Sequence, residues 1–193
     1  MQPLGCTIWY ISWYLREYPS DIDGGMIRKM AESTAPEQET ISISRSIWID
    51  TPVERAWQAV TSDEMLTKWY SPGSIWKIPS LNIGETAEFY LLTNYEDPEA
   101  DKTLLTAAIE AAEPNKKLTL RWNANPNFPG MLLVTSFILE EENGGTKVTI
   151  YETGYETVKE EERQMWLDGV GEGYTAALEN LKSLIEKGEL LHQ

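Results

Sequence analysis

The chain has 193 residues, which favours one domain with an appendage, and 41% of them are hydrophobic, which allows a sizeable core. It carries 31 Asp and Glu against 16 Lys and Arg, for a formal net charge of −15. Nucleic acid and anionic membranes both require a basic surface, so we expect neither as a partner of this acidic protein.

The chain has one cysteine and one histidine. Cys6 allows no intrachain disulfide, which fits a reducing compartment and predicts a cytoplasmic protein. His192 lies in the last two residues. This inventory excludes Ser-His-Asp catalysis, Cys-His catalysis and His-rich metal sites in the core. No metal-ligand spacing and no glycine-rich nucleotide loop is found either, so we expect no metal and no cofactor.

The first residues differ in composition from the rest, and we expect a loosely structured N-terminal extension at residues 1–38 and a domain at residues 41–188. The aromatic run IWYISWYL at residues 8–15 is too short to span a bilayer. Two interpretations stay open. Translation starts naturally at Met26 or Met30, or the aromatic run docks on the body of the protein or on a second subunit.

One strand and two short helices follow. Residues 41–50 alternate between apolar and polar, which predicts a strand. Asp50-Thr51-Pro52 predicts the start of a helix, with an N-cap residue before a proline in the first turn. Residues 61–64 restart a second helix, which Ser71-Pro72-Gly73 ends.

The middle of the chain predicts about six antiparallel strands separated by turn signals. We place them at residues 74–79, 86–93, 102–112, 117–123, 131–140 and 147–153. The strongest turn signal is the hairpin sequence ENGG at residues 142–145. Without crossover helices these strands form a meander, which twists and curls.

Apolar residues recur three or four apart at residues 159–187, which predicts one long amphipathic helix that covers the concave face of the sheet. Gly188 is its expected C-cap. Gly169, Gly171 and Gly173 suggest close packing of the backbone or a bend. We expect an irregular start or a bend there, residues 165–174 facing a ligand, and residues 177–185 in plain core.

These segments carry a family resemblance. The helix opening TPVERAWQAVTS (51–62), the stretch EMLTKWYSPG (64–73) and the strand opening IGETAEF (83–89) contribute to it, as do AAEPNKKLTLRW (111–122), GGTKVTIYETGY (144–155) and DGVGEGYTAALENLKSLIE (168–186). Residues 41–187 resemble the SRPBCC, or START-like, helix-grip superfamily. Within it, they are most similar to the branch of heat-shock-protein-90 ATPase activator homologues.

The resemblance implies an α+β helix-grip fold, in which a seven-stranded antiparallel sheet wraps round the C-terminal helix with a hydrophobic cavity between them. Members of the superfamily bind lipids, hormones, polyketides or other apolar molecules, and a minority catalyse cyclisation or hydrolysis.

Strand parity, helix periodicity and the number of wide aromatic side chains nominate the walls of a ligand site. The candidates are Trp57, Trp69, Trp76, Phe89, Leu91, Leu120, Trp122, Leu133, Thr135, Phe137, Trp166, Val170 and Tyr174. Any single one of them is more often an ordinary core residue. As a set, however, they include more wide aromatics than a tight core usually takes, namely Trp69, Trp76, Trp122, Trp166 and Tyr174.

Glu152 is the one polar candidate, because it shares strand parity with Val148 and Ile150 and should point inward. A buried carboxyl needs a partner or a raised pKa. Three roles stay open: pairing with Arg121 or Arg163, a hydrogen bond to a ligand hydroxyl, and acid–base catalysis. Glu88 and Glu110 have the opposite parity and should be solvated.

The leading functional hypothesis is binding of a small hydrophobic or amphipathic molecule, with no reaction assigned. The alternatives are a chaperone-associated module, similar to the heat-shock-protein-90 activator, and a hydrolase or cyclase that uses Glu152. The chain is expected to be a monomer or a homodimer.

Overall fold

The computed structural model describes residues 40–71, 73–92, 102–124 and 132–191. The expected N-terminal extension therefore lies outside the described residues. The strands are β1 (Ser42–Ile49), β2 (Ile75–Lys77), β3 (Thr86–Leu92), β4 (Lys102–Glu113), β5 (Lys117–Trp122), β6 (Val134–Glu142) and β7 (Gly145–Thr153). The helices are α2 (Val53–Thr61), α3 (Asp63–Trp69) and α4 (Glu160–Lys187).

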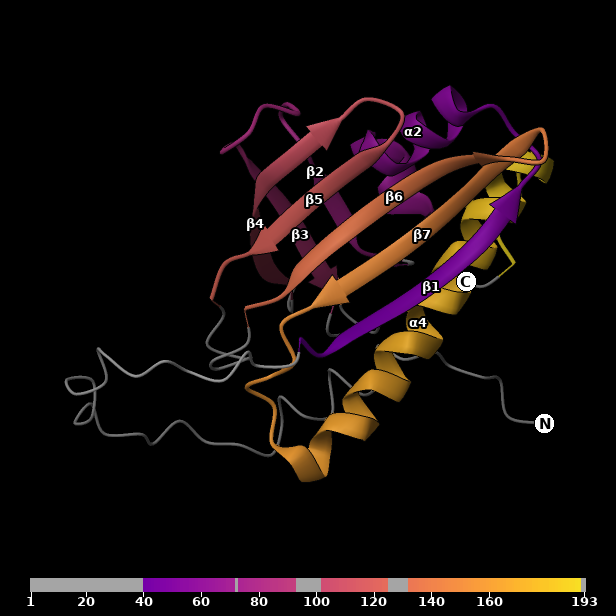
Figure 1. Cartoon of the computed structure of the whole chain (residues 1–193). Coiled ribbons are helices and arrows are strands. Elements are labelled where there is room, and N and C mark those ends of the chain that lie inside the picture. Colours follow the sequence, from indigo (N-terminus) through magenta and orange to yellow (C-terminus); the bar gives the residue numbers. More distant parts are fainter. Residues whose placement is uncertain (1–39, 72, 93–101, 125–131, 192–193) are drawn as a thin grey trace.

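The seven strands form one antiparallel sheet in the order β1-β7-β6-β5-β4-β3-β2. Consecutive strands from β2 to β7 pair as a meander, and β1 pairs with β7 at the other edge. The sheet curls, and α4 lies along it beside β1 (Figure 1). The predicted α+β helix-grip fold is confirmed.

The β6–β7 hairpin has its turn at Asn143 and Gly144, which both adopt positive φ (51° and 79°). Two successive positive φ angles match the twist of antiparallel strands, and Asn-Gly is the pair that adopts them most readily. The hairpin predicted from the sequence at residues 142–145 is confirmed.

The start of α2 differs from the prediction. Pro52 itself is the N-cap residue, and no side chain caps the helix. Asp50 lies two residues before this position, and its backbone N–H donates to the carboxylate of Glu186 on α4 at 2.9 Å. In contrast, α3 has a polar cap, because Ser62 Oγ accepts a hydrogen bond from the backbone N–H of Met65 at 3.4 Å.

Helix α4 runs without interruption across its three glycines, so the irregular start predicted there is wrong. The other interpretation, close packing, fits Gly171. A Cβ at Gly171 would lie 2.2 Å from Nη2 of Arg45 and 3.0 Å from Cδ1 of Ile43, both on β1. The absence of a side chain therefore lets the helix approach the edge strand.

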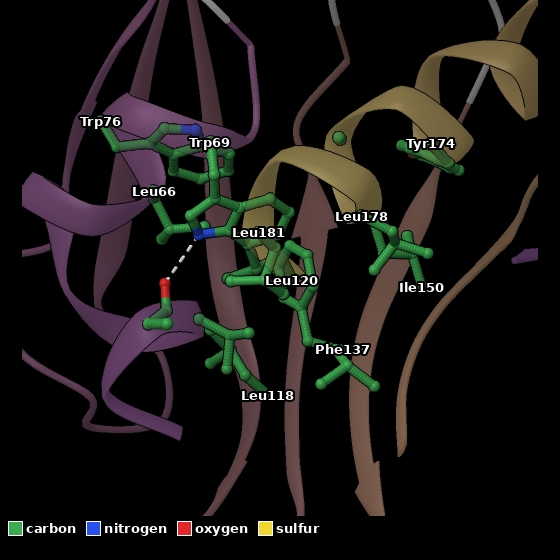
Figure 2. Packing of buried hydrophobic residues seen from close by; sticks show 14 of the residues in the cluster. Leu66, Trp69, Trp76, Leu118, Leu120, Phe137, Ile150, Tyr174, Leu178 and Leu181 are labelled. Atoms are coloured by element: carbon green, nitrogen blue, oxygen red, sulfur yellow. Dashed lines mark hydrogen bonds between the residues drawn. The ribbon is translucent and has the colours of Figure 1, made fainter. Parts of the chain in front are cut away.

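The second half of α4 packs in the core as predicted, with Ala177, Leu178, Leu181 and Ile185 buried. Figure 2 shows Leu178 and Leu181 among side chains of α3 and the sheet. Trp69 Nε1 donates to the Ala59 carbonyl at 2.9 Å, which joins α3 to α2. Among the helices that the structure describes, none has the length and hydropathy of a membrane span.

Gly154 provides a test of the path of the chain after β7. It has φ +111°, and a Cβ there would lie 2.4 Å from the Leu132 carbonyl oxygen. Gly154→Ala should lower the free energy of unfolding by roughly 2–5 kcal/mol, because backbone strain adds to a clash with backbone. Gly188→Ala is the control, since Gly188 has φ +77° with nothing within 4 Å and should cost about 1–2 kcal/mol. Equal losses in urea denaturation would contradict the close contact at Gly154.

Candidate ligand-binding site

Glu152 lies near the end of β7 and is only 3% exposed. Its neighbours across the sheet are Ile43 on β1 and Thr135 on β6. Because the preceding inward residues of β7, Val148 and Ile150, are also buried, the carboxyl continues the concave face of the sheet, where its parity predicts it.

Hydroxyl groups surround the carboxyl. Thr135 Oγ1 donates to Oε2, and the Tyr155 hydroxyl donates to Oε1. Tyr174, on α4, also donates a hydrogen bond to this carboxyl. Trp122 Nε1 on β5 donates to Thr135 Oγ1 at 2.8 Å, which extends the network by one step. Two neighbouring strands, α4 and the segment after β7 thus meet at one carboxyl group.

The arginine pairing considered for Glu152 is not found among these interactions. Arg121 has the opposite strand parity and forms an ion pair with Glu110 at 2.5 Å, on the exposed face. Arg163 donates from Nη2 to the Val158 carbonyl at 3.0 Å, near the start of α4. Glu110 and Glu88 are both partly exposed and have cationic partners, as their predicted outward parity requires.

Burial sets the protonation of the cluster. It raises the pKa of the Glu152 carboxyl, and the hydrogen bonds from Thr135, Tyr155 and Tyr174 partly oppose this rise. Burial also raises the pKa of Tyr155 and Tyr174, and the charge of Glu152 raises them further. The hydroxyls are therefore held in their neutral, proton-donating form.

Tyr70 connects this network to a group of aromatic rings. Its hydroxyl is hydrogen-bonded to Tyr174. Its ring lies 5.3–6.2 Å, between centroids, from five others: Trp69, Trp76, Phe89, Phe137 and Tyr174. We call these six residues and Trp122, which contacts Trp76 and Phe89, the aromatic cluster.

Eight of the fourteen predicted site residues are joined by these ring contacts and hydrogen bonds. They are Trp69, Trp76, Phe89, Trp122, Thr135, Phe137, Glu152 and Tyr174. The other six belong to the same core, with Leu91 and Leu120 buried and with Trp57, Leu133, Trp166 and Val170 partly buried.

Sequence reasoning missed Tyr70 and Tyr155. Tyr155 follows Gly154, whose positive φ breaks the strand alternation on which parity depends. Tyr70 is the C-cap residue of α3 and keeps helical dihedrals (φ −70°, ψ −47°), so its four-residue spacing from the buried Leu66 could have placed it inward. For Tyr155 the signal was chemical, since an inward carboxyl without a basic partner requires hydroxyl donors nearby.

The indole N–H of Trp76 is a buried donor without an acceptor among the described residues. Trp76 is 2% exposed. A buried donor without a partner costs about 1–3 kcal/mol, so such groups need an explanation. An acceptor on a bound molecule would satisfy it.

A surface pocket of about 580 Å³ lies elsewhere, where β1, α2 and the end of α4 meet. Its cationic Lys182 donates to the Trp48 carbonyl at 2.7 Å and to Glu186 at 2.8 Å. Glu186 also accepts from the backbone of Asp50. Because these polar groups already have partners, this pocket is a weaker candidate than the Glu152 cluster.

The comparisons with known proteins agree with the fold. The family model described as "Activator of Hsp90 ATPase homolog 1-like protein" matches residues 50–186. Protein MLL2253 from Mesorhizobium loti is similar in structure, with a TM-score of 0.61 at 20% identity over 78% of this chain and 100% of its own.

The Aha1 dimer from Colwellia psychrerythraea has a TM-score of 0.57 at 21% identity, covering 77% of this chain and 98% of its own. DynU16, described as a putative protein in the dynemicin biosynthetic locus, has a TM-score of 0.58 at 16% identity, covering 82% and 51%. At these identities the likeness shows the fold alone. No curated protein matches the chain.

The raised pKa of Glu152 predicts a pH dependence of stability. The pKa of Glu152 in the folded protein lies above its unfolded value of about 4.3. At a pH between these two pKa values, the native state therefore binds more protons than the unfolded state. Wild-type stability should therefore lose a contribution as pH rises from about 4.3 through the folded pKa. Glu152→Gln should remove this dependence, and Glu161→Gln, which changes an exposed carboxyl on α4, should keep it. Identical pH slopes for all three proteins in urea denaturation would contradict the assignment.

Proposed function

The chain belongs to the family of Activator of Hsp90 ATPase homolog 1-like proteins, and on that premise we propose that it binds a small hydrophobic or amphipathic molecule between the sheet and the first half of α4. The observation that carries the proposal is the buried Glu152 carboxyl, which is bonded to hydroxyl groups. This carboxyl places one polar group at the end of an otherwise mostly apolar interior between the sheet and α4.

The surroundings of the carboxyl support binding. The groups that act on Glu152 are neutral hydroxyls, so the carboxyl is not held in an ion pair and can exchange hydrogen bonds with a ligand. Apolar walls with a few convergent polar groups are typical of small-molecule sites. The aromatic cluster supplies such walls, and Trp76 adds an unused donor.

The same contacts disfavour catalysis by Glu152. A carboxylate has about four acceptor sites on its two oxygens, and three are occupied by Thr135, Tyr155 and Tyr174. A general base must reach the proton that it removes within hydrogen-bond distance. A hydrolase or cyclase reaction would require this network to rearrange, so binding is the better proposal.

The chaperone-associated role remains the second candidate, because the description of the matching family contains it. A change in the ATPase rate of a heat-shock-protein-90 chaperone on addition of this protein would support it. For oligomeric state, the Colwellia relative is described as a dimer. We propose a monomer or homodimer here, which light scattering after size-exclusion chromatography distinguishes.

A fluorescent probe tests the binding proposal. N-phenyl-1-naphthylamine, which is neutral and apolar, should bind the wild type saturably. Val170→Trp should weaken this binding by about tenfold or more, because Val170 lies one turn before Tyr174 on α4 and a larger side chain would fill the site. Leu184→Trp is the matched control, since Leu184 is also partly buried on α4 but lies in the core half. Absence of saturable binding, or equal losses in the two variants, would refute the proposed site.

A further inference from the structure

Tyr70 occupies the centre of the aromatic cluster. Its ring meets those of Trp69, Trp76, Phe89 and Phe137 at interplanar angles of 75–90°, the edge-to-face geometry that aromatic pairs prefer. Its hydroxyl bonds to Tyr174, which bonds to Glu152. The surroundings are thus complementary to a phenol, with rings round the body and one hydrogen bond at the polar end.

Tyr70 also lies at a position from which its side chain can rotate out of the aromatic cluster. It is the C-cap residue of α3 and the last one with a helical backbone bond, and Gly73, with φ +79°, lies three residues further on. The residue as a whole is partly exposed, whereas its hydroxyl lies inside the cluster, where burial raises its pKa. Rotation of the side chain toward solvent would therefore empty a ring-sized space without unpacking the core.

Trp76 provides a second, independent sign of a ligand. Its ring lies 5.3 Å from that of Tyr70 and 5.8 Å from that of Trp122, so its unpartnered Nε1–H belongs to the same cluster. Arg163 Nε is buried without a partner too, but its guanidinium is held at the Val158 carbonyl, by the start of α4. A neutral oxygen within the cluster would accept from Trp76.

We propose that the site takes a neutral hydroxyarene, meaning one or more aromatic rings with a phenolic hydroxyl, and that Tyr70 fills the place of this ligand when the site is empty. This inference rests on the proposed function and names its ligand class. An anionic ligand fits less well, because its charge would lie beside the Glu152 carboxyl with neutral hydroxyls between them.

The first experiment replaces the side chain of Tyr70 with a free molecule. Tyr70→Ala should bind phenol, which supplies the ring and hydroxyl that this variant lacks, and rising phenol concentration should stabilise the variant. Benzene has the same ring without the hydroxyl and should bind about tenfold more weakly. Adding Tyr174→Phe should abolish the preference. Tyr90→Ala is the control, because Tyr90 lies on the other face of the sheet beside Glu88 and should bind neither compound tightly.

The second experiment uses wild-type protein and larger rings in calorimetric titration. 2-Naphthol should bind about tenfold more tightly than naphthalene, and 2-naphthoate most weakly. Tyr70→Ala should bind 2-naphthol more tightly than the wild type, because no side chain has to move. If Tyr70→Ala does not fold, Tyr70→Phe replaces it, and it should also bind 2-naphthol more tightly, since its ring lacks the hydrogen bond that holds Tyr70 in place.

The outcomes separate the two proposals. Equal, saturable binding of naphthalene and 2-naphthol would overturn the hydroxyarene inference and leave the hydrophobic site intact, as would tighter binding of 2-naphthoate. Weaker binding of 2-naphthol by the Tyr70 variants than by the wild type would overturn the role of Tyr70. Failure of every compound, N-phenyl-1-naphthylamine included, would refute the binding function itself.

Discussion

Burial of the Glu152 carboxyl beneath α4 is the constraint on which the interior depends. A carboxyl removed from water must be protonated or must receive strong hydrogen bonds. Thr135, Tyr155 and Tyr174 provide them, and each comes from a different segment of the chain. The same three contacts therefore fix β6, the end of β7 and α4 relative to one another. The positive φ of Gly154 belongs to this arrangement, because it turns the chain after β7 so that Tyr155 reaches the carboxyl only three residues away.

The two halves of α4 have different roles. From Ala177 onward the helix buries small and aliphatic side chains, and Asn180 accepts from the backbone of Leu191. Before that point, the backbone of Gly171 packs closely against Arg45 and Ile43 of β1, and the Tyr174 hydroxyl is hydrogen-bonded to Glu152. Close packing at Gly171 holds the helix against the edge of the sheet, so Tyr174 is presented to Glu152 from a fixed backbone. Tyr70 then closes the network from α3, with its hydroxyl on Tyr174 and its ring among those of the sheet.

Much of this could be predicted from the sequence, because alternation, turn residues and helical periodicity depend on local geometry. They located every strand from β1 to β7 and the full length of α4, and strand parity placed Glu152 inward. The predictions failed where the structure depends on contacts between segments that are distant in the sequence. Pro52 rather than Asp50 or Thr51 became the cap of α2, and Gly171, one of three glycines that suggested an irregular helix, instead serves a tertiary contact with Arg45. Tyr155 was missed because it lies just beyond β7, Tyr70 was missed although its spacing from Leu66 is helical, and the hydroxyl partners of Glu152 depend on how distant segments meet.

The Tyr70 ring fills the space in which the proposed hydroxyarene would bind. The most direct measurement is the set of intermolecular nuclear Overhauser effects between 2-naphthol and the isotope-labelled protein. The ligand protons should contact the rings of Trp76, Phe89 and Tyr174, and the Tyr70 ring should lose its contacts with Trp76 and Phe89. Contacts confined to Trp48 and the surface pocket near Arg55, with the Tyr70 ring unmoved, would contradict the claim.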